Sequence, residues 1–375
     1  ERWRALAARA IAEPEEAGGL IATGGFAFAA DGGAAPHWHG FPPASLIVPE
    51  VAIVRREGRV HMLLAAAAEP DDVAEQLLAR LQRRVEELHA QPLPLLDPAP
   101  AGRFDVASAM PPAHYEHAVA RAVELIGRGS FEKIVLSREV HVHAPAPYDA
   151  AALLGVLRSE FPSCFCLAVG RGEACLIAAS PELLVRREGQ RLSTVALAGS
   201  MRRSADPAVD DHLGEQLLRD PGYRNEHAIV ARRIERMLRA HSVWVASAPE
   251  PVLVRIANIQ HLATPIRAQL AEPLDALAMV GLMHPTPAVG GEPLAAAAPL
   301  IPALEGLDRG WYLGPAGWTD AAGDGEFCVV LRCALLREKI AHCYAGGGIV
   351  ASSDPASELA ETEVKLQALL PLLAA

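Results

Sequence analysis

The sequence predicts an α+β fold in which helices pack on the outer faces of antiparallel sheets. Strand-like runs are joined by short polar turns, "EGQ" at 188–190 and "REK" at 337–339, and helical patterns come in groups between them. Tight turns join antiparallel strands, whereas parallel strands need long crossovers. The 375 residues, 51% of them apolar, are enough to bury a large core.

The hydrophobic periodicity predicts the elements in chain order. In the first ninety residues we expect a short amphipathic helix, a glycine-rich strand, a strand pair and a second helix, the last three at 22–34, 45–66 and 71–90. A proline-rich passage over 91–105 indicates a linker. Beyond it we expect a helix at 112–129, a strand at 132–142, two strands within 174–200, a long helix at 225–241 and two strands within 325–350.

Charge and composition exclude several classes of function. The net charge is −11 and the basic residues are scattered, so we expect no nucleic-acid partner. No apolar run reaches the length of a membrane span, and the first thirty residues lack the apolar block of a secretion signal, so we expect a cytoplasmic protein without a membrane role. The six cysteines lie mostly in apolar runs and are interpreted as small buried hydrophobic residues.

The stretch "GGGIVASSDPASELAETEVKLQ" at 346–367 predicts a helix that begins at Pro355 behind a Ser353 or Asp354 cap. Helical spacing places Glu358, Glu361 and Lys365 on one face. A solvated first turn with a Glu361–Lys365 ion pair would explain this face without any function. Spacing alone favours this interpretation, and only the rest of the chain can change it.

Two charged residues lie in patterns that predict burial. Arg332 falls within the apolar run "FCVVLRCALL", which we interpret as a strand, and a buried guanidinium needs an anion or a structural ion pair to an Asp or Glu. Glu226 shares a helical stripe with Val230 and Ile234, so its carboxylate is expected to point to the core and to need a cation. Glu226 and Glu361 together could bind Mg²⁺.

Lys133 and Glu182 are candidates for proton transfer. Lys133 alternates with Phe131 and Val135 in a strand and would be a general base if that face is the inner one, or an ordinary edge lysine if it is the outer one. Glu182 follows a proline at a strand junction and is by itself only a turn carboxylate. With a metal site, these residues describe an enzyme that moves protons on an anionic small molecule.

The same segments resemble the chorismate-utilising enzymes, and within them the isochorismate synthases. The resemblance covers the C-terminal two thirds of the chain, in the family's order, and rests on "FEKIVLSR" (131–138), "SPELLVR" (180–186), "ALAGSMRR" (196–203), "EHAIV" (226–230), "QHLATPIRA" (260–268), "HPTPAVGG" (284–291), "DRGWYLGPAGW" (308–318), "LRCALL" (331–336) and "AGGGIV…SDPASELAETEVK" (345–365). It implies a single domain over 1–375, with an N-terminal sub-region at 1–100 and a catalytic core at 105–375, built on large antiparallel sheets in a two-layer core.

The resemblance also implies a reaction and roles for residues. The reaction is the Mg²⁺-dependent conversion of chorismate to isochorismate, in which water enters at C2 and the C4 hydroxyl leaves. Lys133 would be the general base and Glu182 the general acid, and the metal ligands would be Glu226, Glu361 and, nearby, Glu358. The remaining matched positions would bind substrate: Gly199, Thr264, Ala288, Arg332, Tyr344, Gly347, Gly348 and Lys365.

Ala288 and Val289 in "HPTPAVGG" resemble the isochorismate-forming branch. The alternatives are a salicylate synthase, an ammonia-using aminochorismate synthase, and a non-catalytic relative that binds chorismate. We expect no attached glutaminase domain and a monomer or weak dimer. One departure from the family pattern is Pro221–Gly222 before the Glu226 helix. The sequence does not say whether the product feeds a siderophore, menaquinone or another pathway.

Overall fold

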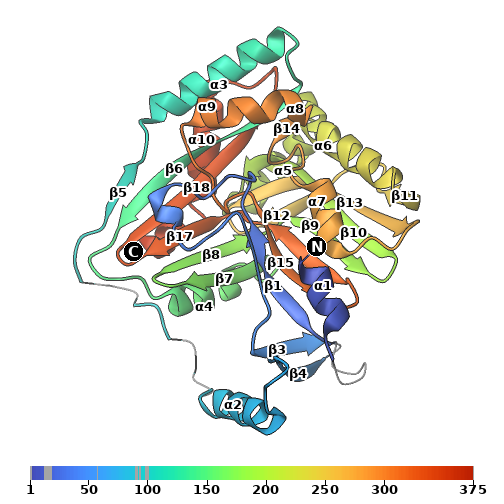
Figure 1. Cartoon of the computed structure of the whole chain (residues 1–375). Helices are drawn as coiled ribbons and strands as arrows, with labels where there is room; N and C mark the ends of the chain where they lie inside the picture. The colour runs from blue at the N-terminus through green and yellow to red at the C-terminus, as the bar shows by residue number, and fades with distance from the viewer. Residues whose placement is uncertain are drawn as a thin grey trace.

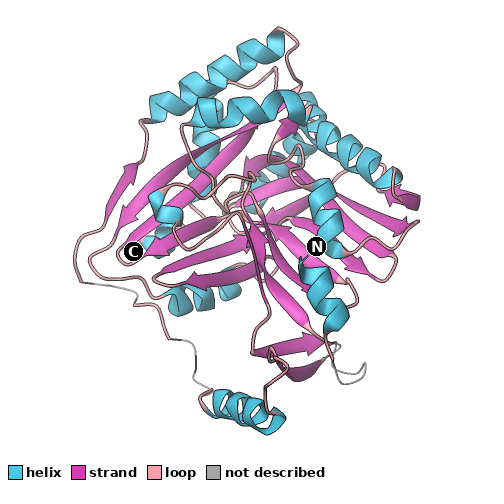
Figure 2. Cartoon of the chain, viewed as in Figure 1, coloured by secondary structure: helices cyan, strands magenta, loops and turns pink. Residues whose placement is uncertain are grey.

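The structure is a computed structural model that describes residues 2–11, 19–56, 58–88, 92, 94–97 and 101–374. Parts of the linker predicted over 91–105 lie outside these residues. Figures 1 and 2 show a body of two large sheets with helices on the outside, which confirms the predicted α+β class. Among the helices that are described, none has both the length and the apolar character needed to cross a lipid bilayer.

The larger sheet has nine strands in the order β11-β13-β10-β9-β16-β15-β1-β2, and β12 also pairs with β13. All its pairings are antiparallel, as expected from the tight turns. Its strands are β1 (Ile21–Phe26), β2 (Ala44–Ile47), β9 (Leu183–Glu188), β10 (Arg191–Arg202), β11 (Ser242–Ser247), β12 (Val252–Ile256), β13 (Ile259–Leu270), β15 (Pro315–Asp320) and β16 (Gly325–Val329).

The second sheet has seven strands in the order β14-β6-β18-β17-β8-β7, and β5 also pairs with β6. These pairings are antiparallel as well. The strands are β5 (Asp105–Ser108), β6 (Lys133–His143), β7 (Phe165–Arg171), β8 (Ala174–Ser180), β14 (Gly291–Glu292), β17 (Cys333–Arg337) and β18 (Ile340–Ile349). A separate hairpin consists of β3 (Val51–Arg56) and β4 (Arg59–Leu64).

The helices are α1 (Arg2–Arg9), α2 (Ala74–Glu86), α3 (Pro112–Gly127), α4 (Ala150–Glu160), α5 (Pro207–Arg219), α6 (Pro221–Arg239), α7 (Ala276–Met283), α8 (Leu294–Ala297), α9 (Ile301–Glu305), α10 (Pro355–Leu366) and α11 (Leu370–Leu373), with short 3₁₀ turns η1 (Pro36–Trp38) and η2 (Ala298–Leu300). Helix α6 packs on β10, whereas α3 and α4 cover the second sheet. A helix that covers a sheet in this way buries an apolar stripe against the strands and exposes its polar face to solvent.

Buried side chains of both sheets meet in one large cluster, which includes Leu176 and Leu335 from the second sheet and Phe327 from the first. Successive side chains of a strand point to opposite faces, so β6 contributes Val135 to this cluster and Leu136 to a separate one under α3. The inner face of β6 therefore faces the space between the sheets, and it also carries Lys133.

Two segments that were each predicted as one strand are divided into two strands in the structure. The first run breaks at Pro181–Glu182, where the chain leaves β8 in the second sheet and enters β9 in the first. The second breaks after Val329, where the chain leaves β16 and enters β17. The prediction that Arg332 lies within a strand is wrong, because Arg332 sits at this crossing with a φ of +46°.

Both helices that carry the predicted glutamates begin at a proline behind an aspartate cap. The Asp220 carboxylate accepts hydrogen bonds from the N–H groups of Gly222 and Tyr223, so the atypical Pro221–Gly222 pair is the first turn of α6. The Asp354 carboxylate caps α10 in the same way through the N–H of Ser357. The cap is thus Asp354 rather than Ser353, one of the two predicted candidates.

Candidate active site

A pocket lies between the two sheets at the places where the chain crosses from one to the other. The first crossing contributes Glu182 and the second contributes Arg332. Glycines of β18 and side chains from α6 and α10 also line the pocket. Because the two crossings come from segments about 150 residues apart, only the folded topology brings them to one cavity.

Lys133 forms an ion pair with Glu226, which lines this pocket and is partly buried. The Lys133 side chain is 1% exposed, and its ammonium donates to the Glu226 Oε1 at 2.9 Å. The strand pattern left open whether Lys133 lies on the inner or the outer face of its strand. In the structure it lies on the inner face of β6 and is buried. Lys133 also supplies the cation that the sequence pattern required for Glu226.

Glu182 is a buried carboxyl that lines the pocket and is 4% exposed. Burial raises its pKa to about 8, although the nearby charge of Lys133 acts in the opposite direction. Glu182 therefore holds its proton at neutral pH. The N–H of Glu182 donates to the Ser180 hydroxyl at 3.2 Å, which fixes the backbone at the crossing.

The three glutamates predicted as metal ligands lie on α6 and α10 and reach toward β18. Glu361 pairs with Lys365 at 2.7 Å, and the Ser353 hydroxyl donates to the Glu358 carboxyl at 2.6 Å. Burial, followed by repulsion from Glu361, raises the pKa of Glu358 to about 8. In the described part of the chain, the oxygens of Glu226, Glu358 and Glu361 do not all come within 4.8 Å of one another.

This donor set fits a hard divalent cation. Carboxylate oxygens are the ligands that Mg²⁺ prefers, and Mg²⁺ typically keeps some positions for water and substrate. Without a metal, Glu358 retains a proton, which reduces the repulsion among the neighbouring acids. A bound cation would reduce the same repulsion by compensating their negative charge. The Glu361–Lys365 ion pair, which the sequence could explain without any function, is also present. This pair by itself argues neither for nor against a metal.

The absence of side chains at Gly347 and Gly348 is what lets these groups approach the strand. A Cβ at Gly348 would lie 2.3 Å from the Glu226 Oε1 and 2.9 Å from the Lys133 Nζ. A Cβ at Gly347 would lie 2.6 Å from the Glu358 Oε2. All three distances are below van der Waals contact, so a side chain at either glycine would displace these charged groups.

Two buried polar atoms of residues that line the pocket lack a hydrogen-bond partner among the described residues. The Arg332 Nη2 donates to the His261 Nε2 at 2.8 Å, but within the part of the chain that the structure describes the Nη1 and the Tyr344 hydroxyl make no hydrogen bond. Within the described residues, Arg332 makes no ion pair with a carboxylate, so the structural ion pair considered for it is absent. Because unpartnered buried donors are costly, these groups indicate a polar or anionic ligand.

The remaining predicted substrate residues fall into two groups. Gly199, Ala288 and Lys365 line the pocket, and Gly199 has a φ of +76° at a bulge between β10 and β13. The Lys365 ammonium also donates to the Gly346 carbonyl at 2.7 Å. Thr264 is buried on β13 outside the pocket lining, where its hydroxyl bonds the His227 Nε2 at 2.8 Å.

A family model described as "Chorismate binding enzyme" matches residues 1–374. This chain belongs to the chorismate-binding enzyme family. The match confirms the resemblance inferred from the nine ordered strings, and it extends over the N-terminal part of the chain as well.

Relatives of this chorismate-binding enzyme agree in sequence and in structure. The salicylate biosynthesis isochorismate synthase of Pseudomonas aeruginosa is 38% identical over 376 aligned residues, which cover 100% of this chain and 78% of that protein. The solved structure of MenF, the menaquinone-specific isochorismate synthase from Escherichia coli, aligns with a TM-score of 0.80 at 28% identity, over 94% of this chain and 79% of that one. A putative 2,3-dihydroxybenzoate-specific isochorismate synthase from Bacillus anthracis aligns with a TM-score of 0.76 at 29% identity, over 94% and 84%.

A histidine that lines the pocket of this chorismate-binding enzyme was not singled out from the sequence. His261 lies between Arg332 and the Ser200 hydroxyl, which it contacts at 3.0 Å through Nδ1. Burial, and then the positive charge of Arg332, hold the pKa of His261 well below its usual range. A neutral His261 can accept from Arg332 and so orient the guanidinium. The sequence offered no signal for it beyond its position in the matched string "QHLATPIRA".

Proposed function

We propose that this protein is an isomerase, an isochorismate synthase that converts chorismate to isochorismate. The observation that carries the proposal is a proton-holding carboxyl in the pocket, Glu182, with the buried Lys133 close enough to influence its pKa and paired with the pocket residue Glu226. An acid and a base at one site are what the exchange of one hydroxyl for another requires. The names of the relatives in the sequence and structure comparisons support the same reaction.

The substrate would bind through its two carboxylates. Arg332 and Lys365 provide positive charge, and the free Nη1 of Arg332 and the hydroxyl of Tyr344 provide unused donors. A guanidinium is well suited to a carboxylate because its planar fork can donate two parallel hydrogen bonds. Gly347 leaves the backbone of β18 uncovered, so its edge can come close to the ligand.

The chemistry would consist of two proton transfers. Once Lys133 has released its own proton to solvent, its neutral amine would take a proton from the water that adds at C2 of the ring, and Glu182 would give its proton to the C4 hydroxyl as it leaves as water. The ring double bonds shift between these positions, so one water is consumed and one is released. The raised pKa of Glu182 suits this acid role, because hydroxide is a poor leaving group unless it is protonated.

We further propose that Glu226, Glu361 and Glu358 hold Mg²⁺. When bound, the ion would neutralise the acids and hold a carboxylate of the substrate. Glu226 accepts from Lys133, so a metal held by Glu226 would compete with this ion pair. This competition links the metal site with the proposed base.

The test is to incubate the protein with chorismate and Mg²⁺ and to separate the products by chromatography. We expect isochorismate, without salicylate or pyruvate, and no amino product when ammonium is added. Lys133→Ala and Glu182→Gln should bind chorismate but not turn it over. The proposal fails if folded protein forms no isochorismate, if pyruvate or an ammonium-dependent product dominates, or if both variants turn over normally.

A further inference from the structure

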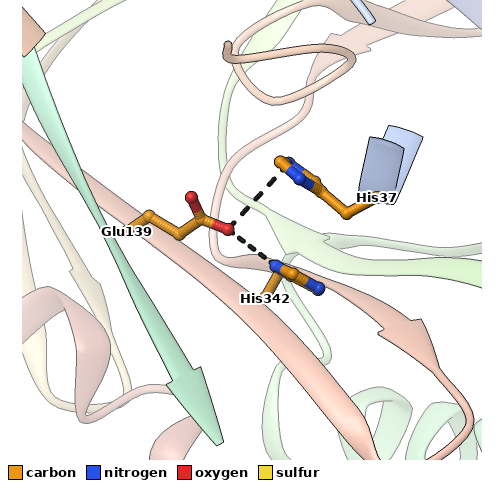
Figure 3. Close-up of side chains that lie close together, drawn as sticks. All are labelled: His37, Glu139 and His342. Atoms are coloured by element: carbon orange, nitrogen blue, oxygen red, sulfur yellow. Dashed lines mark hydrogen bonds and ion pairs between the residues drawn. The ribbon is translucent and has the colours of Figure 1, made fainter. Parts of the chain in front are cut away.

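A second cluster of potential ligands lies outside the pocket and comes from three separate segments of the chain. Figure 3 shows His37 from η1, Glu139 from β6 and His342 from β18 pointing toward one another. The His342 Nδ1 lies 2.7 Å from the Glu139 Oε1, and the His37 Nε2 lies 3.9 Å from the same oxygen. The ligand atoms of these three side chains all lie within 4.8 Å of one another.

The cluster is largely shielded from water and incompletely satisfied. Glu139 and His342 are each 9% exposed, and the buried His37 Nε2 has no hydrogen-bond partner among the residues that are described. A buried nitrogen of this kind is expected to have a partner. The His37 and His342 rings stack at 4.6 Å, which keeps both nitrogens on the side of the carboxylate.

Glu139 is held ionised by its neighbours. Burial alone would raise its pKa, but hydrogen bonds with His141 and His342 lower the pKa of Glu139 to about 2. The His141 Nε2 lies 3.1 Å from the Glu139 Oε1 and thereby orients the carboxylate. Carboxylates and histidines that bind metals commonly have such an outer hydrogen-bond partner.

We propose that His37, Glu139 and His342 bind a divalent transition-metal ion, for which this ligand set fits Zn²⁺. Two imidazole nitrogens and one carboxylate are a common set for zinc, with the fourth position left to water. Tetrahedral bonds of about 2.0–2.1 Å place ligand atoms roughly 3.3 Å apart. To reach this spacing, the His37 Nε2 would approach the Glu139 Oε1 by about half an ångström, and the His342 Nδ1 would move away from it by about the same amount. Side chains can adjust by this much.

This site is separate from the proposed Mg²⁺ site. Glu139 is six residues from Lys133 on the same face of β6, which is roughly 20 Å along a strand. His342 is two residues from Tyr344, whose ring stacks on the fully buried Trp38. A metal bound here would tie the segment around η1 to β6 and β18, next to the wall of the pocket.

The experiment is calorimetric titration of the metal-stripped protein with ZnCl₂, in excess Mg²⁺ to keep Zn²⁺ away from the glutamates. We expect one Zn²⁺ per chain and a rise of Tm with Zn²⁺. His37→Gln and Glu139→Gln should weaken binding by more than the roughly 10- to 100-fold that loss of an outer partner costs, and His141→Gln by about that amount. His212→Gln, on the exposed face of α5, is the matched control and should bind normally.

His37 is the most informative position, because it is half-buried outside the strands and its replacement leaves both sheets intact. Co²⁺ offers a second readout, since four-coordinate Co²⁺ absorbs strongly in the visible range, and this band should be absent in His37→Gln. The proposal is overturned if the wild-type protein takes up no stoichiometric Zn²⁺. It is equally overturned if His37→Gln and Glu139→Gln bind Zn²⁺ as the wild type does.

Discussion

Replacing Glu182 by glutamine should remove the activity and at the same time stabilise the protein. The Glu182 carboxyl is buried and has a pKa of about 8 in the folded protein, against 4.5 in the unfolded chain. Glutamine has nearly the same shape and is neutral at every pH, so it keeps the folded environment. It has no acidic proton to give to a leaving hydroxyl, however, and loss of a general acid typically costs 10²- to 10⁴-fold in rate.

The effect on stability follows from proton linkage. Because the folded state holds the proton more tightly, the contribution of Glu182 to the stability is fully present below about pH 4.5 and is lost as pH rises from about 4.5 to about 8. The two pKa values differ by about 3.5 units, and each unit corresponds to 1.36 kcal/mol. Glu182→Gln avoids this loss, so it should be more stable than the wild type by about 3 kcal/mol at pH 7 and by less than about 1 kcal/mol at pH 5.

The assay is urea denaturation at pH 5 and pH 7, followed by the fluorescence of the buried Trp38 and Trp311. The matched control is Glu188→Gln, because Glu188 is exposed on the neighbouring strand β9. We expect no change of the pH dependence in the control. If the stability difference between Glu182→Gln and wild type is the same at both pH values, Glu182 is ionised in the folded protein and the acid role is refuted.

The other predictions concern space, charge and metal. Gly348→Ala should lower turnover by more than about 100-fold while the protein still folds, because the new Cβ would displace Lys133 and Glu226. The control Gly281→Ala, with nothing within 4 Å of its Cβ, should keep full activity, and comparable kcat values for the two variants would contradict the packing argument. Arg332→Gln should raise KM for chorismate by about 10- to 100-fold with a smaller change in kcat, as expected for a charged hydrogen-bond donor, and an unchanged KM would exclude a carboxylate at this position. Chelation with EDTA should abolish turnover and Mg²⁺ should restore it, and full activity in EDTA would remove Mg²⁺ from the account.

The secondary structure could be predicted from the sequence wherever one periodic pattern belonged to one element. Helix α10 begins at Pro355, as predicted from its cap. The pattern could not reveal that two strand runs change sheets, at Pro181–Glu182 and before Arg332, because a strand buried on both sides stays apolar across such a crossing. Those crossings are where the pocket forms.

The candidate site was predictable only in part for a related reason. Lys133 and Glu226 stood out because charges are unusual in apolar patterns, but the pattern could not show that they pair with each other at a separation of 93 residues. The cluster of His37, Glu139 and His342 gave no local signal at all. Its members lie on three segments whose proximity depends on the register of β6 and β18 and on the path of the N-terminal segment.

The measurement that tests the central claim most directly is turnover of chorismate in oxygen-18 water. Addition of water at C2 with departure of the C4 hydroxyl predicts isochorismate that carries one heavy oxygen on its C2 carbon, as read by mass spectrometry of the product. Isochorismate without the label would mean that the hydroxyl migrates within the molecule, and the roles given to Lys133 and Glu182 would then be wrong.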